Sequence, residues 1–308
     1  MSLYQDLRPK DFNSMIGNKS TIKSLKKIIS QPPIERPHTF LFTGERGTGK
    51  TTSARILSKE FGAGDIDVEE LNGSDNRGID DMRRVIQIAN IAPMGGKCRV
   101  FILDEIHKLT GDAMNCLLKV LEDVPKSTYF ILCSTDPDKI IKTIRSRCIT
   151  YRFELLNEKE MELLLDIILK KIVKDIPDSV FFGIVNCADG SPRQALVLLE
   201  QVLSLEDENE QLNLLKKSQI EHSIVEIGRL ILRESSWKNI VEIYKGISDN
   251  EPEIIRRCLL GYFKSVLLNS NDKSFKVCDI IRILEKNTFD GGEAQLLRML
   301  FDCSLKEK

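Results

Sequence analysis

Residues 43–52 read T-G-E-R-G-T-G-K-T-T and directly follow an apolar run at 40–42. This is the pattern of a phosphate-binding loop, in which glycines allow the backbone amides to turn towards an anion. Lys50 would supply a charge for the outer phosphates and Thr51 a hydroxyl for Mg²⁺, and a helix starting near Lys50 would add its positive end. The alternative is a glycine-rich turn with an incidental lysine. The residues of the expected loop are Gly44, Glu45, Arg46, Gly47, Thr48, Gly49, Lys50, Thr51 and Thr52.

The composition indicates a soluble globular protein of two or three domains, with 308 residues, 42% hydrophobic and 30% charged. A net charge of −1 gives no overall attraction to nucleic acid or membranes, so any DNA contact must come from local clusters. Charges within the first fifteen residues argue against a signal peptide, and no apolar run approaches the roughly 18 residues of a membrane span. The eight cysteines contain no C-x-x-C pair, which argues against zinc and for reduced thiols in the cytoplasm.

Strands and helices alternate in the first half of the chain. After an irregular arm at 3–17 and a helix at 18–29, strands are expected at 38–43, 68–71, 99–104, 129–135 and 149–153, and helices at 50–61, 80–91 and 110–122. Nearly continuous apolar strands that alternate with helices predict an α/β fold, with a parallel sheet covered on both faces.

Strand signals stop after residue 154. Helices are expected at 158–173, 179–187, 192–203, 224–232, 237–244 and 252–268. The acidic, unpatterned stretch 205–211 predicts a linker. We therefore expect three domains: 1–155, 156–205 and 206–308.

Two carboxylates end the apolar strand V-F-I-L-D-E, namely Asp104 and Glu105. Beside the phosphate loop, Asp104 would hold Mg²⁺ and Glu105 would polarise the water that attacks the γ-phosphate, which predicts ATP hydrolysis. The alternative is an acidic strand end exposed to solvent. Thr135 closes the next expected strand, where its hydroxyl would orient that water or sense the γ-phosphate, or simply form a turn.

Two arginines are candidates for contact with the phosphates. Arg147, in R-S-R-C, is expected at the end of a helix that faces away from the phosphate loop. It is either a finger for a neighbouring subunit's site or a surface arginine, and spacing alone does not choose between them. Arg193 follows a predicted cap, Ser191, and Pro192 at the first helical position. A cation there is unfavourable without a nearby anion, which the phosphate of ATP would provide.

Five motifs in this order carry a family resemblance: G-E-R-G-T-G-K-T, I-L-D-E, the strand-end Thr135, S-R-C and G-S-P-R-Q-A-L. Together they resemble the AAA+ ATPases of sliding-clamp loaders, and S-R-C points to the motor subunits. Residues 91–148 are similar to the bacterial tau/gamma subunit, whereas E-L-N-G-S-D-N-R-G-I at 70–79 resembles the small subunits of replication factor C. The resemblance covers residues 1 to about 203; beyond that, only length and helical character agree.

This resemblance implies an AAA+ P-loop sheet domain, a small helical lid and an all-helical collar through which five subunits assemble. It implies ATP and Mg²⁺ as cofactors, and a sliding clamp, other loader subunits and primer–template DNA as partners, with no membrane. The location would be the cytoplasm, a host's cytoplasm if the protein is viral, or the nucleus if it is eukaryotic.

The resemblance also assigns roles to residues. Lys50 and Thr51 would bind phosphate and Mg²⁺, Asp104 and Glu105 would act on Mg²⁺ and water, and Thr135 would be the first sensor. Arg147 would act in trans as the finger and Arg193 as the second sensor. The residues expected to border the adenine are Tyr4, Arg8, Pro9, Met15 and Ile16.

The contacts to DNA and the clamp are left open. Arg77, Arg83 and Arg84 flank the start of the helix expected from Asp80, which in this family tracks the DNA backbone; they equally suit a solvated face. Ile88, Ile91 and Met94 at its far end would dock on the clamp or pack in the core.

The sequence departs from the bacterial relatives in two places. The four-cysteine zinc insertion is missing at 61–67, and the sequence ends at Lys308 without the polymerase-binding extension. The other functions considered are a remodeller of replication forks or recombination junctions, a scaffold subunit of the loader, and a small-molecule P-loop kinase.

Overall fold

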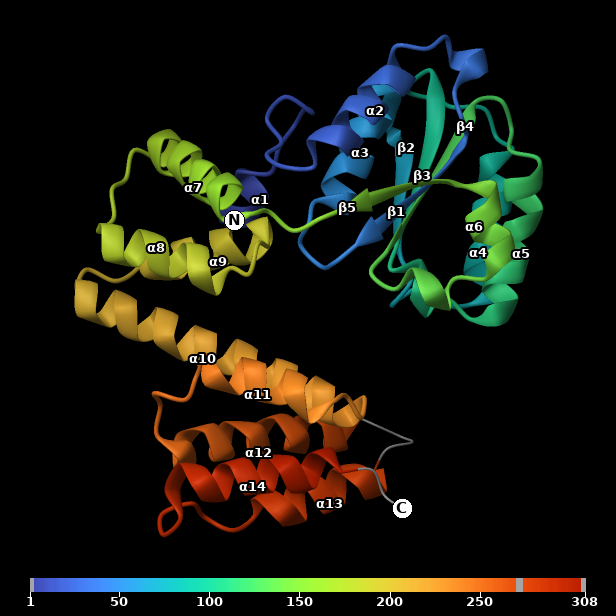
Figure 1. Ribbon diagram of the computed structural model, residues 1–308. Helices are drawn as coiled ribbons and strands as arrows, with labels where there is room; N and C mark the ends of the chain where they lie inside the picture. The colour runs from blue at the N-terminus through green and yellow to red at the C-terminus, as the bar shows by residue number, and fades with distance from the viewer. Residues whose placement is uncertain (1–2, 270–273, 306–308) are drawn as a thin grey trace. The chain divides into compact units, whose positions relative to one another are not determined.

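The computed structural model describes residues 3–269 and 274–305. The chain forms two compact units, the first ending at Ser204 and the second beginning at Leu205 (Figure 1). The first holds a sheet, its covering helices and a group of three helices, and the second is helical. The finer division into three domains remains a prediction.

The sheet has five strands in the order β2-β3-β4-β1-β5. Every neighbouring pair is parallel, which confirms the predicted α/β fold. β1, β3 and β4 are almost entirely buried, because helices cover both faces. The strands are β1 (Thr39–Gly44), β2 (Ala63–Asn72), β3 (Cys98–Asp104), β4 (Thr128–Ser134) and β5 (Ile149–Phe153). β2 is longer than predicted, and β4 ends one residue before Thr135.

Helices lie on both faces of the sheet (Figure 1), and an apolar layer lies between the sheet and the helices on each side. Phe40 and Phe42 of β1 pack with α2 (Lys19–Ile29) and α3 (Lys50–Glu60). Leu41, between them, packs on the other face, because successive strand residues point to opposite sides. That face is covered by α4 (Ile79–Ala89), α5 (Gly111–Glu122) and α6 (Lys142–Arg147). The short segments are α1 (Leu3–Asp6) and the 3₁₀ turns η1 (Pro33–Glu35), η2 (Ile106–Lys108) and η3 (Pro137–Lys139).

A three-helix group follows β5 within the first unit. It comprises α7 (Glu158–Ile172), α8 (Asp178–Cys187) and α9 (Pro192–Val202). The Ser191 hydroxyl accepts a hydrogen bond from the Gln194 amide, which confirms the expected cap of α9. We call this group the lid.

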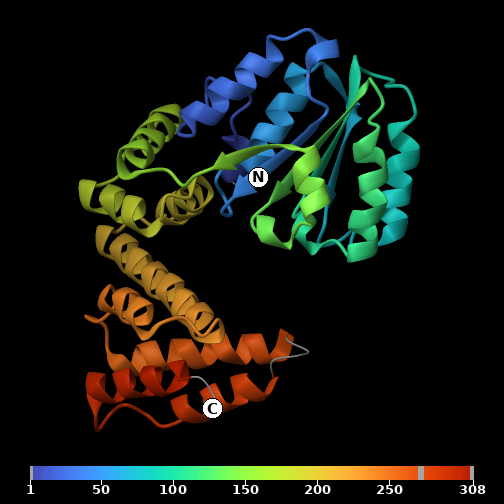
Figure 2. The same ribbon diagram turned by 45° about the vertical axis from the view of Figure 1, so that its right-hand side comes forward.

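The second unit contains α10 (Glu208–Leu232), α11 (Trp237–Lys245), α12 (Pro252–Asn269), α13 (Ser274–Leu284) and α14 (Gly292–Ser304), of which α12, α13 and α14 lie side by side (Figure 2). The linker predicted at 205–211 is wrong in its second half, because α10 begins at Glu208; residues 205–207 are the non-helical segment at the start of the second unit. The Asp207 carboxylate caps the Glu210 amide, and Gln211 is buried and donates to the Leu205 carbonyl. The acidic residues of this stretch therefore lie at the start of a helix, where the helix dipole favours negative charge.

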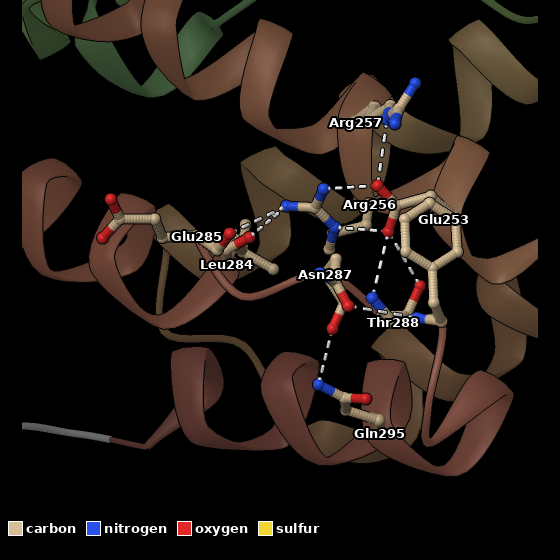
Figure 3. A network of polar contacts seen from close by, with 9 residues as sticks. Glu253, Arg256, Arg257, Leu284, Glu285, Asn287, Thr288 and Gln295 are labelled. Atoms are coloured by element: carbon tan, nitrogen blue, oxygen red, sulfur yellow. Dashed lines mark hydrogen bonds and ion pairs between the residues drawn. The ribbon is translucent and has the colours of Figure 1, made fainter.

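A buried ion pair fixes the α13–α14 loop to α12 (Figure 3). Glu253 pairs with Arg256 at 2.5 Å and accepts bonds of 3.0 Å from both the amide and the hydroxyl of Thr288. Arg256 also donates to the Leu284 carbonyl at 2.6 Å. Both charges are therefore paired and hydrogen-bonded, as burial requires.

Within residues 3–269 and 274–305, no helix combines the length and apolar character that crossing a membrane requires.

Candidate active site

A cavity of about 820 Å³ opens between the phosphate loop, the N-terminal arm and the lid. It brings together most of the predicted nucleotide-site residues, from segments far apart in the sequence. Gly44 and Glu45 do not line it. The predicted residues that line it are Tyr4, Arg8, Pro9, Met15, Ile16, Arg46, Gly47, Thr48, Gly49, Lys50, Thr51, Thr52, Asp104, Glu105, Thr135 and Arg193.

The loop between β1 and α3 depends on glycine at particular positions. Gly47 has φ +84°, and a Cβ there would lie 2.3 Å from the Ser191 hydroxyl oxygen. Gly44 has φ +142°, and its Cβ would lie 2.1 Å from the Phe153 carbonyl. Neither position accepts a side chain without displacement of a neighbour, so this loop conformation requires glycine at both.

Lys50 is the first residue of α3, and its side chain reaches back to the loop. Its Nζ donates to the carbonyls of Gly44 at 2.8 Å and Glu45 at 2.6 Å. Burial lowers the pKa of Lys50. Gly44 and Glu45 thus hold the lysine, although they do not line the cavity.

The oxygen atoms of Thr51 and Asp104 are of a kind that fits the Mg²⁺ expected from the sequence. The Thr51 hydroxyl donates to Asp104 Oδ2 at 2.7 Å, and both residues line the cavity. A hydroxyl and a carboxylate are hard oxygen ligands of the kind Mg²⁺ takes beside nucleotide phosphates. In the described part of the chain, no three His, Cys, Asp or Glu side chains gather as a metal cluster. The absence of zinc stays a prediction.

Glu105 is held by two side chains. It has φ +50°, accepts a bond of 2.6 Å from the Ser74 hydroxyl and pairs with Lys108 Nζ at 2.5 Å. The bonds from Lys108 and Ser74 lower the pKa of Glu105. Neither partner was predicted from the sequence. Ser74 lies in E-L-N-G-S-D, a stretch that contributed only a family resemblance and no expected site residue.

Thr135 lies just past β4, exposed, and lines the same cavity as Asp104. Thr135 therefore borders the cavity, although the residue no longer belongs to the strand. Asn72, at the end of β2, also lines the cavity and was not predicted.

Arg193 enters the cavity from the lid. Its guanidinium carbon lies 4.8 Å from the centre of the Tyr4 ring, and that of Arg8 lies 5.2 Å from the same centre. Arg8 Nη2 also donates to the Tyr4 hydroxyl at 2.6 Å. The arm and the lid therefore meet through stacked cations and one aromatic ring.

Arg147 lies outside the cavity at the end of α6. Its Nη2 pairs with Glu122 at 2.6 Å and its Nη1 donates to the Thr143 carbonyl at 2.9 Å. The side chain is about one third exposed, at 33%. A role for Arg147 would therefore lie in another subunit's site.

The three predicted DNA arginines are near the start of α4. Arg83 pairs with Asp80 at 2.9 Å, Arg84 pairs with Glu69 at 3.1 Å, and both are largely exposed. Arg77 lies before the helix and donates to the Ser74 carbonyl at 2.8 Å. The structure thus allows both the DNA-contact and the solvated-face readings.

The three residues of the predicted apolar stripe, Ile88, Ile91 and Met94, lie in two different environments. α4 ends at Ala89, so Ile91 and Met94 lie in the following loop and are 54% and 81% exposed. Ile88 packs against the core instead. The expectation that the helix reaches residue 91 is wrong, because Asn90 caps α4 and the chain turns towards β3.

The parallel sheet, the phosphate loop between β1 and α3, the paired carboxylates after β3 and the lid define an AAA+ P-loop protein. The profile of the family described as "DNA polymerase III, delta subunit" matches residues 65–157.

Curated relatives are DNA polymerase III subunits. The gamma/tau subunit of Mycobacterium tuberculosis is 34% identical over 227 residues, covering 66% of this chain and 39% of the relative. The tau subunit of Bacillus subtilis is 32% identical over 224 residues, with coverage of 66% and 39%. The gamma subunit of Buchnera aphidicola is 32% identical over 223 residues, with coverage of 66% and 61%.

The chain is similar to the bacterial gamma and tau subunits over 66% of its own length, and it spans less than two thirds of the length of these relatives. Among solved structures, the Thermotoga maritima RuvB Holliday junction branch migration motor is similar, with a TM-score of 0.58, 22% identity and coverage of 78% of this chain and 80% of that one. This likeness concerns the fold alone.

Proposed function

We propose that the chain is an ATP-hydrolysing subunit of a clamp loader, which helps to open a sliding clamp and load it on primer–template DNA during replication. Its partners would be the clamp and other loader subunits, assembled as a pentamer in the cytoplasm. The carrying observation is the convergence of Lys50, the Thr51–Asp104 pair and Glu105 on one cavity that Arg193 enters from the lid. The relatives named above are bacterial, so a viral or nuclear setting finds no support.

The proposed chemistry assigns a step to each group. Lys50 and the loop amides hold the phosphates, and Thr51 and Asp104 hold Mg²⁺, which when bound neutralises charge on the phosphate oxygens. Glu105, freed from Ser74 and Lys108, orients the attacking water and accepts its proton. Thr135 hydrogen-bonds that water.

Two arginines would act on the developing charge. Arg193 would contact the γ-phosphate from the lid, and Arg147 would do so in a neighbouring subunit's site after leaving Glu122. The ion pair at 2.6 Å is partly exposed, so exchanging it for a phosphate is a small change in free energy.

The clamp contact would use the loop 90–97. Asp67 accepts bonds from the amides of Met94 at 2.8 Å and Gly95 at 2.6 Å, and lies 3.4 Å from Arg99. This buried carboxylate fixes the loop that exposes Ile91 and Met94. An exposed apolar side chain on a fixed loop suits a partner protein. DNA would be contacted through Arg77, Arg83 and Arg84.

Two other functions remain as alternatives. The first is a remodeller of forks or junctions, a function that the same fold also carries in a branch migration motor. A scaffold subunit of the loader would not need Lys50, Glu105 and Arg147, which this chain has.

The test is steady-state ATP turnover of the chain with its candidate loader partners, with and without primed DNA and the candidate clamp. We expect DNA and clamp together to stimulate turnover. Arg147→Ala should abolish the stimulation and leave ATP binding intact, because Arg147 lies outside this chain's cavity. Arg145→Ala is the matched control, since Arg145 is on the same helix and pairs with Asp138 at 3.4 Å.

Turnover that is indifferent to the clamp would refute the loader assignment. Stimulation by branched DNA instead would favour the remodeller. An equal loss with Arg145→Ala would remove the specific role of Arg147.

A further inference from the structure

The ring of Tyr4 carries two guanidinium groups, and one of them belongs to the lid. The distances from the ring centre are 5.2 Å for Arg8 and 4.8 Å for Arg193. Arg8 comes from the same arm and also donates to the Tyr4 hydroxyl at 2.6 Å, so it fixes the orientation of the ring. Arg193 comes from α9, so its contact joins the arm to the lid.

Arg193 needs a negative partner. It occupies the first turn of α9, where the backbone dipole disfavours a cation. Within the described residues, it forms no ion pair with a carboxylate. The negative face of the Tyr4 ring is the group that receives its charge.

The backbone of Arg193 nevertheless lies beside the phosphate loop. A Cβ added to Gly47 would lie 3.3 Å from the Cβ of Arg193. The Cβ of Arg193 thus lies beside the phosphate loop, whereas its guanidinium group lies over the Tyr4 ring of the N-terminal arm. A guanidinium in this position has two alternative partners, the ring of Tyr4 and a phosphate in the cavity.

We propose that Tyr4 is a positioning residue for Arg193: its ring holds the guanidinium until the γ-phosphate of ATP takes it over, and receives it again when only ADP remains. The inference rests on the proposed ATP site. Because ADP offers no γ-phosphate, the ring and the nucleotide compete for Arg193 only in the ATP state. Tyr4 therefore lowers the preference of the site for ATP over ADP.

The test measures the affinity of the full chain for ATPγS and for ADP, both with Mg²⁺, by titration calorimetry. Tyr4→Leu removes the ring face, and we expect the preference for ATPγS to rise about 2- to 10-fold, the range of a partly exposed cation–π contact. Tyr4→Phe keeps the ring face but loses the hydrogen bond from Arg8, so its preference for ATPγS should lie between those of the wild type and Tyr4→Leu. Effects on the adenine change both affinities alike and cancel in the ratio.

Arg193→Met supplies the control background. There Tyr4→Leu should leave the ratio unchanged, because the competing cation is gone. An unchanged or lower preference in Tyr4→Leu would overturn the inference, and so would an equal rise in the Arg193→Met background. If the wild type binds neither nucleotide, the proposed function itself fails; if it binds both but the ratio does not respond, only the role of Tyr4 fails.

Discussion

Val173 ends α7 in a backbone conformation that suits glycine. It has φ 53° and ψ 51°, and its amide donates to the Lys170 carbonyl at 3.4 Å, so it closes the lid helix in the left-handed region. A β-branched residue is rarely found there. Its side chain is 86% exposed and gains almost no burial in return. We therefore predict that Val173→Gly stabilises the first unit.

The expected gain follows from two opposing effects. The left-handed conformation costs an L-residue about 1–2 kcal/mol. Glycine is also more flexible in the unfolded chain, which lowers the free energy of unfolding by about 0.5–1 kcal/mol and offsets part of this gain. The net gain of about 0.5–1 kcal/mol corresponds to a rise in Tm of roughly 1–4 °C for a unit of this size.

Scanning calorimetry of the whole chain measures this rise. Leu165→Ala, which removes a fully buried lid side chain, identifies the transition of the first unit by lowering its Tm by several degrees. Val173→Ala is the matched control, because it removes the branch but keeps an L-residue in the left-handed region, and its gain should be smaller. A Tm for Val173→Gly at or below that of the wild type would refute the reasoning.

Three further predictions concern charged side chains. The Arg256 pair and the Thr288 bonds hold the pKa of Glu253 below its ordinary value of 4.5, so its stabilising effect is present above that pH and lost as the pH falls through the folded-state pKa. Glu253→Gln should therefore lower the Tm of the second unit at pH 7, with a difference from the wild type that shrinks towards pH ~3 in melts followed by circular dichroism; a difference independent of pH would contradict this. Lys108→Met removes the stronger of the two restraints on Glu105 and leaves the bond from Ser74, so it should raise basal ATP turnover about 2- to 5-fold, the scale of a partly exposed ion pair; an unchanged rate would count against restraint of Glu105 by Lys108. Asp67→Asn weakens the bonds to Met94 and Gly95 and should reduce affinity for the candidate clamp about 3- to 10-fold in surface plasmon resonance, with ATP binding retained; equal clamp affinity would remove the loop from the interface.

The sequence determined the features that depend on neighbours along the chain. The glycine spacing at 44–49 and the apolar run before it specify a strand, a tight turn and a helix start, and the structure has all three. Alternation of apolar strands with helices was enough for the parallel sheet. Asp104 and Glu105 could be placed because parallel strands end at one edge of a sheet.

Composition gave a wrong prediction where one local pattern is compatible with two structures, a linker and the start of a helix. The acidic run at 205–211 read as a linker, but the Asp207 cap and the buried Gln211 make its second half part of α10. Acidic residues are common both in linkers and at helix starts, and only packing of the following turns distinguishes them.

The tertiary structure alone decided which distant side chains meet. Ser74 on Glu105, Tyr4 on Arg193, and Asp67 under the loop at Met94 join segments with no shared local pattern. A hydrogen bond or stacked ring depends on positions to within a fraction of an ångström, and those positions follow from the packing of the whole unit. The periodicity of apolar residues determines which face of a helix or strand is buried, but not which side chain of another element that face contacts.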